Sequence, residues 1–249
     1  MSKKIFRHIP NTITCLNLLC GCLSILSSLN GALETAAYFI FAAAVFDFFD
    51  GFAARWLQAY SAIGKELDSL ADVVSFGVAP AFIMYEMLLK AAAKYDLPVE
   101  FYSSGWWVSA AAFLIAAFSA LRLAKFNIDT RQTDSFIGLP TPANALFICS
   151  LAFTSSGGNH SWAIFTGNMF FLLGITIVFS YLLVSELPLF SLKFKSFNWK
   201  NNKIRYLFVA FSALILIGFH WAGFSLVILL YVILSIITNI LYNRTVSTS

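Results

Sequence analysis

The chain has 249 residues, of which 59% are hydrophobic and only 11% are charged. An ordinary soluble domain carries about 25% charged residues, so this sequence has too few charges to build the surface of a soluble protein. The net charge of +4 is modest and gives no indication of nucleic-acid binding. The composition therefore indicates a membrane protein.

Apolar runs of about 20 residues, the length that crosses a bilayer as a helix, predict an all-α integral membrane protein with eight spans. The weakest is the fifth, which opens with two prolines, Pro140 and Pro142; proline is tolerated in a first helical turn. No internal repeat or low-complexity linker divides the chain, so we expect one domain over residues 1–249. The eight spans are expected near residues 12–29, 32–52, 66–90, 105–125, 139–157, 162–187, 204–219 and 222–242.

The distribution of basic residues orients these spans. All lysines and arginines except Lys90 and Lys94 fall in loops or ends on one side of the expected membrane. The positive-inside rule places that side, and both termini, in the cytoplasm. A cleaved signal peptide at the basic start is disfavoured because the first apolar run is long and more spans follow. Residues 3–9 are expected to form a short amphipathic helix on the anionic cytoplasmic leaflet.

Four carboxylates interrupt the apolar sequence. Asp47 and Asp50 are three residues apart, and Asp68 and Asp72 are four apart, so each pair shares one helix face. One charge near the bilayer centre costs roughly 2.5–3.5 kcal/mol, so four unpaired charges would oppose folding by on the order of 10 kcal/mol. A single acid could pair with a basic neighbour such as Arg55, but four acids leave an excess of negative charge. Oxygen ligands on two helices suit Mg²⁺ or Mn²⁺, so we expect a metal site.

The acids belong to a longer pattern, D-x2-D-G-x2-A-R-x8-G-x3-D-x3-D, which runs from Asp47 to Asp72 without a departure. This pattern resembles the signature of the CDP-alcohol phosphotransferases, integral membrane enzymes of phospholipid synthesis. The resemblance implies a six-helix catalytic core, a homodimer, and two divalent cations, Mg²⁺ or Mn²⁺, at the cytoplasmic face. The core would then occupy residues 1–187, and residues 204–242 would hold two additional spans.

The resemblance also implies roles for individual residues. Asp47, Asp50, Asp68 and Asp72 would be the metal ligands, and Asp72 would also be the general base. The planar guanidinium of Arg55 suits bidentate phosphate contact, and Gly51 and Gly64 leave room for phosphate or a neighbouring helix. The residues expected to contact the CDP part of the lipid donor, CDP-diacylglycerol, are Pro10, Asn11, Thr12, Ile13, Gly51, Arg55 and Ser61.

The segment between the fourth and fifth spans bears on the acceptor alcohol. An arginine-led stretch there precedes Gly138-Leu-Pro-Thr-Pro142, and this resembles the corresponding region of the membrane-embedded phosphatidylserine synthases of bacteria and archaea. The implied acceptor is L-serine, whose carboxylate an arginine or lysine would bind while an amide side chain orients its amine. The alternative is that these bases merely flank two spans on the cytoplasmic side. The candidates are Arg122, Lys125 and Arg131 for the carboxylate, and Asn127 and Gln132 for the amine.

The expected activity is therefore transfer of the phosphatidyl group of CDP-diacylglycerol to serine, with release of CMP, in a bacterial or archaeal cytoplasmic membrane. A sister enzyme with glycerol phosphate or inositol phosphate as acceptor would require a denser basic cluster near the metals. A divalent-cation transporter is a more distant alternative. Against it, Arg55 adjoins the acids and would repel a permeating cation.

Overall fold

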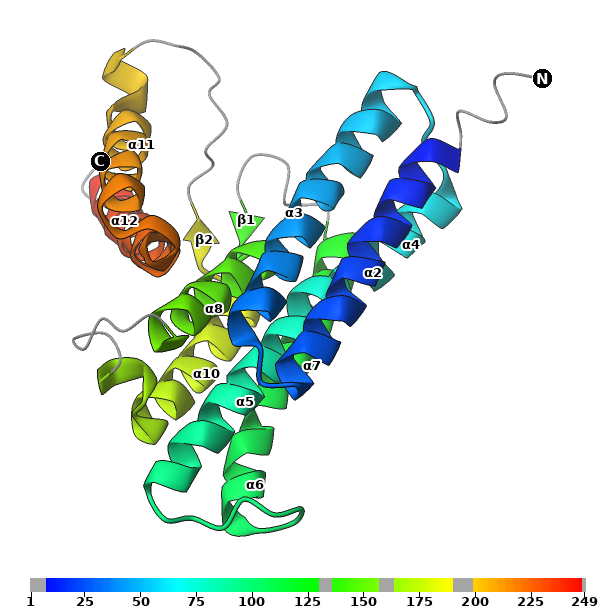
Figure 1. Ribbon diagram of the computed structural model, residues 1–249. Helices are drawn as coiled ribbons and strands as arrows, with labels where there is room; N and C mark the ends of the chain where they lie inside the picture. Colours follow the sequence, from blue (N-terminus) through cyan, green and yellow to red (C-terminus); the bar gives the residue numbers. More distant parts are fainter. Residues whose placement is uncertain (1–7, 130–135, 157–163, 190–198, 248–249) are drawn as a thin grey trace.

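The structure is a computed structural model, and it is almost entirely helical (Figure 1). The exception within the described residues is a short antiparallel pairing of β1 (Phe136–Ile137) with β2 (Pro188–Leu189). The expected all-α class is confirmed. The described residues are 8–129, 136–156, 164–189 and 199–247, so the amphipathic segment expected at residues 3–9 falls almost wholly outside them.

The helices and helical turns follow one another along the chain. In chain order they are α2 (His8–Leu29), α3 (Leu33–Trp56), α4 (Ala62–Asp72), the π-helical η1 (Val73–Val78), α5 (Ala79–Lys94), α6 (Ser104–Ala110), the 3-10 turn η2 (Ala111–Phe113), α7 (Leu114–Ile128), α8 (Thr141–Ser156), α10 (Met169–Val184), α11 (Trp199–Phe219), the 3-10 turn η3 (His220–Ala222) and α12 (Gly223–Ser247). The strand β1 lies between α7 and α8, and β2 lies between α10 and α11.

Five helical runs among the described residues are long and apolar enough to cross a membrane: His8–Leu29, Leu33–Trp56, Ala62–Lys94, Ser104–Ile128 and Asn202–Ile240. The first four coincide with the first four expected spans. The fifth and sixth spans correspond to the shorter helices α8 and α10, and the last two form one run interrupted by η3. The protein is an integral membrane protein, but the count of eight spans is not confirmed. Hydropathy alone does not show where a helix ends inside an apolar run.

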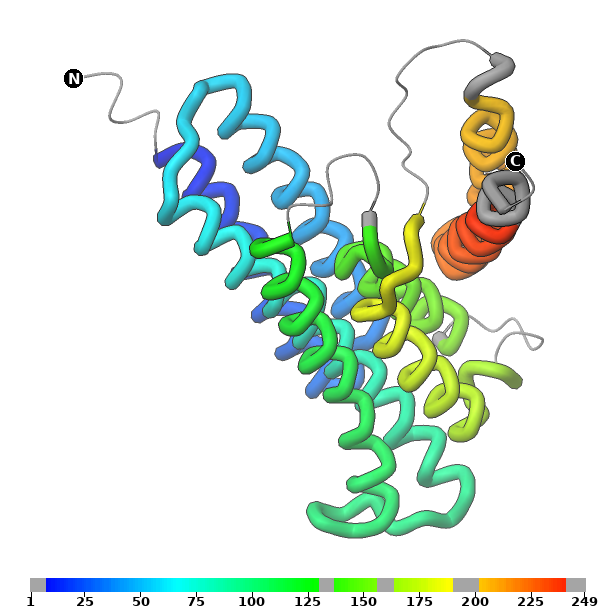
Figure 2. The backbone as a smooth tube through the Cα atoms, turned by 180° about the vertical axis from the view of Figure 1, so that it is seen from behind, coloured from blue at the N-terminus to red at the C-terminus, as the bar shows by residue number. Residues whose placement is uncertain are grey.

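The helices α2, α3 and α4–η1–α5 lie side by side, and α7, α8 and α10 complete the bundle around α5 (Figures 1 and 2). The pair α11–α12 lies to one side, and α12 packs against α8 and β2. Small side chains dominate the core face of α3, where Ala36, Ala37 and Ala43 are fully buried. Small residues allow membrane helices to approach closely, and such packing replaces the hydrophobic effect between helices in lipid.

One face of α2 is small and polar along its whole length. An added Cβ at Gly21 would lie only 2.5 Å from the hydroxyl of Ser75 and 2.9 Å from its Cα, so α2 touches the backbone of η1. The hydroxyl of Ser24 donates to the carbonyl of Ala36 at 2.8 Å and joins α2 to α3. We call this face the α2 seam; its buried residues are Pro10, Thr14, Asn17, Gly21, Ser24 and Ser28.

The helix that carries two of the acids contains a wide turn directly after Asp72. In η1 the N–H of Ala79 donates to the carbonyl of Val74, five residues earlier. Pro80 follows in the first turn of α5 and has no N–H, so it cannot complete the regular ladder. Single π turns of this kind occur frequently at functional sites. Here the turn lies between α2 and α7, with an added Cβ at Gly77 only 2.9 Å from the Cβ of Ser119.

Candidate active site

Three carboxylates from two helices converge near one end of the bundle. Oxygen atoms of Asp47 and Asp50 on α3 and of Asp68 on α4 all lie within 4.8 Å of one another. Asp50 is only 5% exposed, and the other two are partly buried. A set of carboxylate oxygens is the donor chemistry that hard divalent cations prefer. These three residues could therefore hold a metal ion.

Asp72 adjoins this cluster one helical turn beyond Asp68. Its carboxyl group lies close to those of Asp47 and Asp68, and it accepts a hydrogen bond from the amide of Asn17 at 3.3 Å. Because α3 and α4 run in opposite directions, Asp50 and Asp68 form an outer layer, and Asp47 and Asp72 form a deeper one. The structure thus brings all four predicted ligands together, with Asp72 outside the compact group of three.

Two neutral side chains of the α2 seam donate to these acids. The hydroxyl of Thr14 donates to Asp50 at 2.7 Å, and the amide of Asn17 donates to Asp72. Neither residue was predicted from the sequence. The available signal was the recurrence of small and polar residues every three or four positions along an otherwise apolar run.

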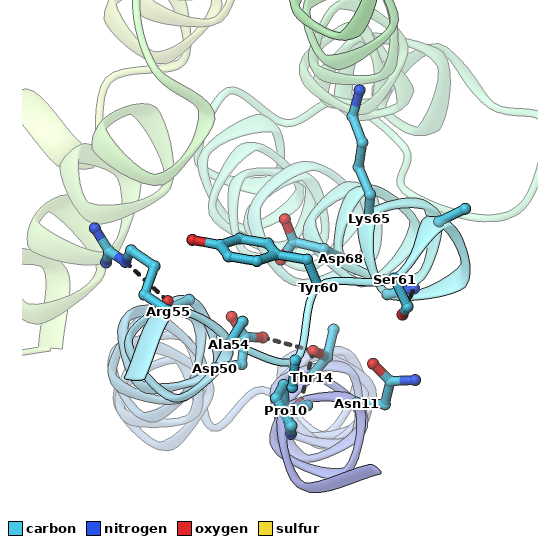
Figure 3. A pocket seen from close by; sticks show the side chains of 14 residues that line it. Pro10, Asn11, Thr14, Asp50, Ala54, Arg55, Tyr60, Ser61, Lys65 and Asp68 are labelled. Carbon is cyan, nitrogen blue, oxygen red and sulfur yellow. Dashed lines mark hydrogen bonds between the residues drawn. The ribbon is translucent and has the colours of Figure 1, made fainter. Parts of the chain in front are cut away.

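A cavity of about 670 Å³ opens beside the acids (Figure 3), within the size range of small-molecule sites. Its walls are the start of α2, the end of α3, the following turn and the start of α4. Five predicted donor contacts line it: Pro10, Asn11, Gly51, Arg55 and Ser61. Thr12 and Ile13 are not among its lining residues, and the hydroxyl of Thr12 donates instead to the carbonyl of His8 at 3.0 Å.

The start of α4 is held tightly against α2. Ser61 caps α4, and its hydroxyl accepts the N–H of Gly64 at 2.9 Å. An added Cβ at Gly64 would lie 2.9 Å from that hydroxyl and 3.0 Å from the side-chain oxygen of Asn11. A methyl group here would displace the Ser61 cap or the Asn11 side chain, so the glycine supports the close approach that the sequence predicted. Gly51 differs: an added Cβ would meet only Arg55, at 3.9 Å, so it leaves open space along the cavity.

The cavity also has aromatic and basic walls. The Nε of Arg55 donates to the carbonyl of Gly51 at 2.9 Å, which folds the side chain back along α3. In Figure 3 the ring of Tyr60 lies across the cavity between Arg55 and Asp68, and Lys65 stands on the α4 side. Tyr60 and Lys65 were not predicted as site residues. They add a flat apolar face and a second positively charged side chain to the wall of the cavity.

Of the predicted acceptor residues on α7, Arg122 interacts with one of the acids, but the cavity that it lines is small. Arg122 is 7% exposed, its guanidinium lies 4.9 Å from the centre of the Phe126 ring, and its charge acts on Asp72. With Lys125 it lines a cavity of only about 30 Å³, about the volume of one water molecule.

Asn127 uses its amide to bridge α7 and α4, because Nδ2 donates to the hydroxyl of Ser69 at 2.9 Å. Ser69 directly follows the metal-ligand candidate Asp68, so this contact anchors the acid-bearing helix. The other two predicted acceptor residues, Arg131 and Gln132, lie outside the described residues.

The family model for CDP-alcohol phosphatidyltransferases matches residues 7–184. The chain belongs to the CDP-alcohol phosphatidyltransferase family. This match includes the acid cluster, the cavity and every helix from α2 to α10, and it ends before α11. The resemblance inferred from the spacing of the eight motif residues is confirmed.

Relatives within this family carry a narrower name. The chain is 41% identical over 147 residues, 59% of its length and 76% of the relative's, to a CDP-diacylglycerol–serine O-phosphatidyltransferase of Bacillus subtilis. It is 34% identical over 210 residues, 84% of its length and 81% of the relative's, to one of Helicobacter pylori. An archaetidylserine synthase of Methanothermobacter thermautotrophicus is 38% identical over 156 residues, which is 61% of each chain.

Proposed function

We propose that this protein transfers the phosphatidyl group of CDP-diacylglycerol to the hydroxyl of L-serine and releases CMP. The observation that carries the proposal is a four-acid cluster beside a 670 Å³ cavity in a family member whose relatives bear the serine transferase name. The shared family accounts for the donor, and the relatives support serine as the acceptor.

The cavity suits the CDP part of the donor. Arg55 and Lys65 supply positive charge for the pyrophosphate, and the N-terminus of α4 adds the positive end of a helix dipole. The ring of Tyr60 offers a face on which the cytosine base stacks, since base–aromatic stacking tolerates any base. The diacylglycerol chains would remain in the bilayer beside the exposed apolar faces of α2 and α3.

Asp47, Asp50, Asp68 and Asp72 would hold two divalent cations, Mg²⁺ or Mn²⁺. Their all-oxygen donor set fits such ions, and the neutral donors Thr14 and Asn17 leave the negative charge of the acids uncancelled. Bound there, the ions would neutralise the pyrophosphate and stabilise the charge that develops as its bridging bond breaks.

Asp72 is the proposed general base. The serine hydroxyl oxygen forms a bond to the phosphorus that carries diacylglycerol, Asp72 accepts the hydroxyl proton, and the bond from that phosphorus to the bridging oxygen breaks to release CMP. Arg122 approaches Asp72 from α7 and is the described residue best placed to bind the serine carboxylate. Lys125, Asn127, Arg131 and Gln132 remain proposed contributors from the same segment.

The proposal includes topology and assembly. The termini and the site would face the cytoplasm, in agreement with the one-sided distribution of lysine and arginine. The protein would act as a homodimer, as the family resemblance implies. Residues 1–249 would then form one catalytic unit to which α11 and α12 are additions.

The test is an acceptor comparison with purified protein in mixed micelles. CDP-diacylglycerol and Mn²⁺ are supplied with labelled serine, glycerol phosphate or inositol phosphate, and labelled lipid is measured. We expect label from serine alone, accompanied by an equal amount of CMP. Label from glycerol phosphate or inositol phosphate, with none from serine, would assign the protein to a sister activity.

A further inference from the structure

Asn17 occupies an unusual position beside the proposed base. Its side chain is completely buried, and its Nδ2 donates to Asp72 Oδ1 at 3.3 Å. Its own side-chain oxygen, Oδ1, has no hydrogen-bond partner in the described part of the structure. A buried acceptor without a partner lowers stability, so an apolar side chain of the same size would suit the packing of α2 better.

The backbone of Asn17 is also held by η1, the segment that follows Asp72. The hydroxyl of Ser75 in η1 donates to the Asn17 carbonyl at 3.0 Å, and Gly21 lets the two segments touch. Asp72 directly precedes η1. The donor on α2 and the carboxylate that it reaches are thus fixed relative to each other by backbone contacts as well as by the side-chain hydrogen bond.

A carboxylate can rotate about its terminal bond, and that rotation decides which oxygen faces the substrate. The hydrogen bond from Asn17 engages Oδ1 of Asp72 and so limits rotation of this carboxylate, which also adjoins Asp47 and Asp68. The charge of Arg122 acts on Asp72 from α7, which packs against η1 as α2 does. The carboxylate is therefore bounded by a fixed neutral donor on α2 and a positive charge on α7.

We propose that Asn17 is a positioning residue, whose amide fixes the orientation of the Asp72 carboxylate for proton transfer. The inference rests on the proposed function in that it takes Asp72 as the base. It assigns to the first membrane helix a part in the chemistry, in addition to its contact with the lipid donor.

The test compares three substitutions of Asn17 in the full-length protein. Asn17→Leu removes the donor at similar volume, and Asn17→Asp keeps the shape but replaces the donor with an acceptor. Asn17→Gln keeps an amide donor. We expect the first two to lower kcat by about ten- to a hundredfold, as for other residues that orient a ligand to a metal, with the KM for CDP-diacylglycerol within about threefold.

Two further readouts separate positioning from a structural role. Asn17→Gln should recover part of the kcat lost in Asn17→Leu. The kcat of Asn17→Leu should also stay low at temperatures well below its own Tm, where the variant is fully folded and a purely structural defect would have no effect. The matched control is Ser24→Ala, which removes another buried hydrogen bond of the α2 seam and should leave kcat unchanged. If Asn17→Leu does not fold, the isosteric Asn17→Asp and the amide-retaining Asn17→Gln still decide the question.

Parental kcat in Asn17→Asp or Asn17→Leu would overturn the proposal. The proposal would also be overturned if Asn17→Leu lost both Tm and kcat and the kcat of Asn17→Gln were no higher than that of Asn17→Leu. The parent is first assayed with serine, glycerol phosphate and inositol phosphate. Activity with another alcohol alone would refute the proposed acceptor, and the Asn17 series would then be measured with that alcohol.

Discussion

Tyr60 is 67% exposed, yet its ring lies across the cavity proposed to bind the donor (Figure 3). Stacking of one base on an aromatic ring is worth about 1–3 kcal/mol. Tyr60→Ala should therefore raise the KM for CDP-diacylglycerol by roughly five- to a hundredfold with little change in kcat. Tyr60→Phe, which keeps the ring, should resemble the parent.

Steady-state kinetics at a fixed serine concentration measure this effect. Trp56 provides the control, because it is an even more exposed aromatic residue nearby that does not line the cavity. Trp56→Ala should leave the donor KM unchanged. An unaltered donor KM in Tyr60→Ala would show that the Tyr60 ring does not bind the donor.

Arg122 is the described residue through which serine recognition can be tested most directly. If its guanidinium binds the serine carboxylate, Arg122→Ala should raise the KM for serine by about ten- to a hundredfold, since a hydrogen bond to a charged group is worth about 1.5–3 kcal/mol. The donor KM should stay nearly constant. Serine methyl ester lacks the carboxylate charge, so it should be a poor acceptor for the parent. Its KM should rise much less than that of serine in Arg122→Ala.

Lys94→Ala, at the far end of α5, is the control for a general loss of positive charge. An equal rise in KM for serine and for its methyl ester would show that Arg122 stabilises the fold and does not bind the serine carboxylate. The small cavity beside Arg122 would then be a packing feature.

At the scale of elements, the contact between α2 and η1 links packing to chemistry. Gly21→Ala would place a methyl group 2.5 Å from the Ser75 hydroxyl and 2.9 Å from the Ser75 Cα. We expect a loss of about 1–3 kcal/mol in stability, typical of overpacking, and a lower kcat because η1 directly follows Asp72. Thermal unfolding in detergent and the serine assay measure the two effects.

Gly174→Ala is the matched control in α10, since an added Cβ there meets nothing within 4 Å. Alanine favours a helix over glycine by up to about 1 kcal/mol, so this variant should be as stable as the parent or more so. Equal behaviour of the two variants would mean that α2 and η1 adjust freely to each other.

The sequence predicted the grouping of the acids better than the residues that support them. Asp47, Asp50 and Asp68 follow from spacing along single helices, which is local information. Thr14 and Asn17 bond to acids 36 and 55 residues away, and no local pattern states which helix faces α2. The paired prolines beyond Gly138 indicated a helix start, and α8 does begin at Thr141.

Helix limits were predicted less well for a related reason. The third span was expected at residues 66–90, but the helix runs from Ala62 to Lys94. Hydropathy falls at the polar residues Lys65 and Glu66, whereas the backbone continues as a helix because Ser61 supplies a cap. The π turn at η1 was not predicted, since it depends on Pro80 together with packing against α2 and α7.

At the scale of the whole molecule, four acids at one end of the bundle predict dependence on a divalent cation. Activity should vanish with EDTA and return with Mg²⁺ or Mn²⁺. Independently of turnover, saturating metal should raise the Tm, since a ligand at a hundred times its Kd stabilises the folded state by about 2.7 kcal/mol. Asp68→Asn should diminish this shift, and full turnover by metal-stripped protein would contradict the prediction.

The continuous helix from Ala62 to Lys94 has 33 residues and is about 50 Å long, whereas the hydrocarbon core of a bilayer is about 30 Å thick. We expect its first turns, which carry Asp68, to reach the layer of phosphates and glycerols, the depth at which a diacylglycerol ester of CDP holds its own pyrophosphate. Enzyme and lipid then meet by lateral diffusion in two dimensions. The relevant quantity is the mole fraction of donor among the membrane lipids, so inert phospholipid slows turnover even when the donor concentration per litre stays the same.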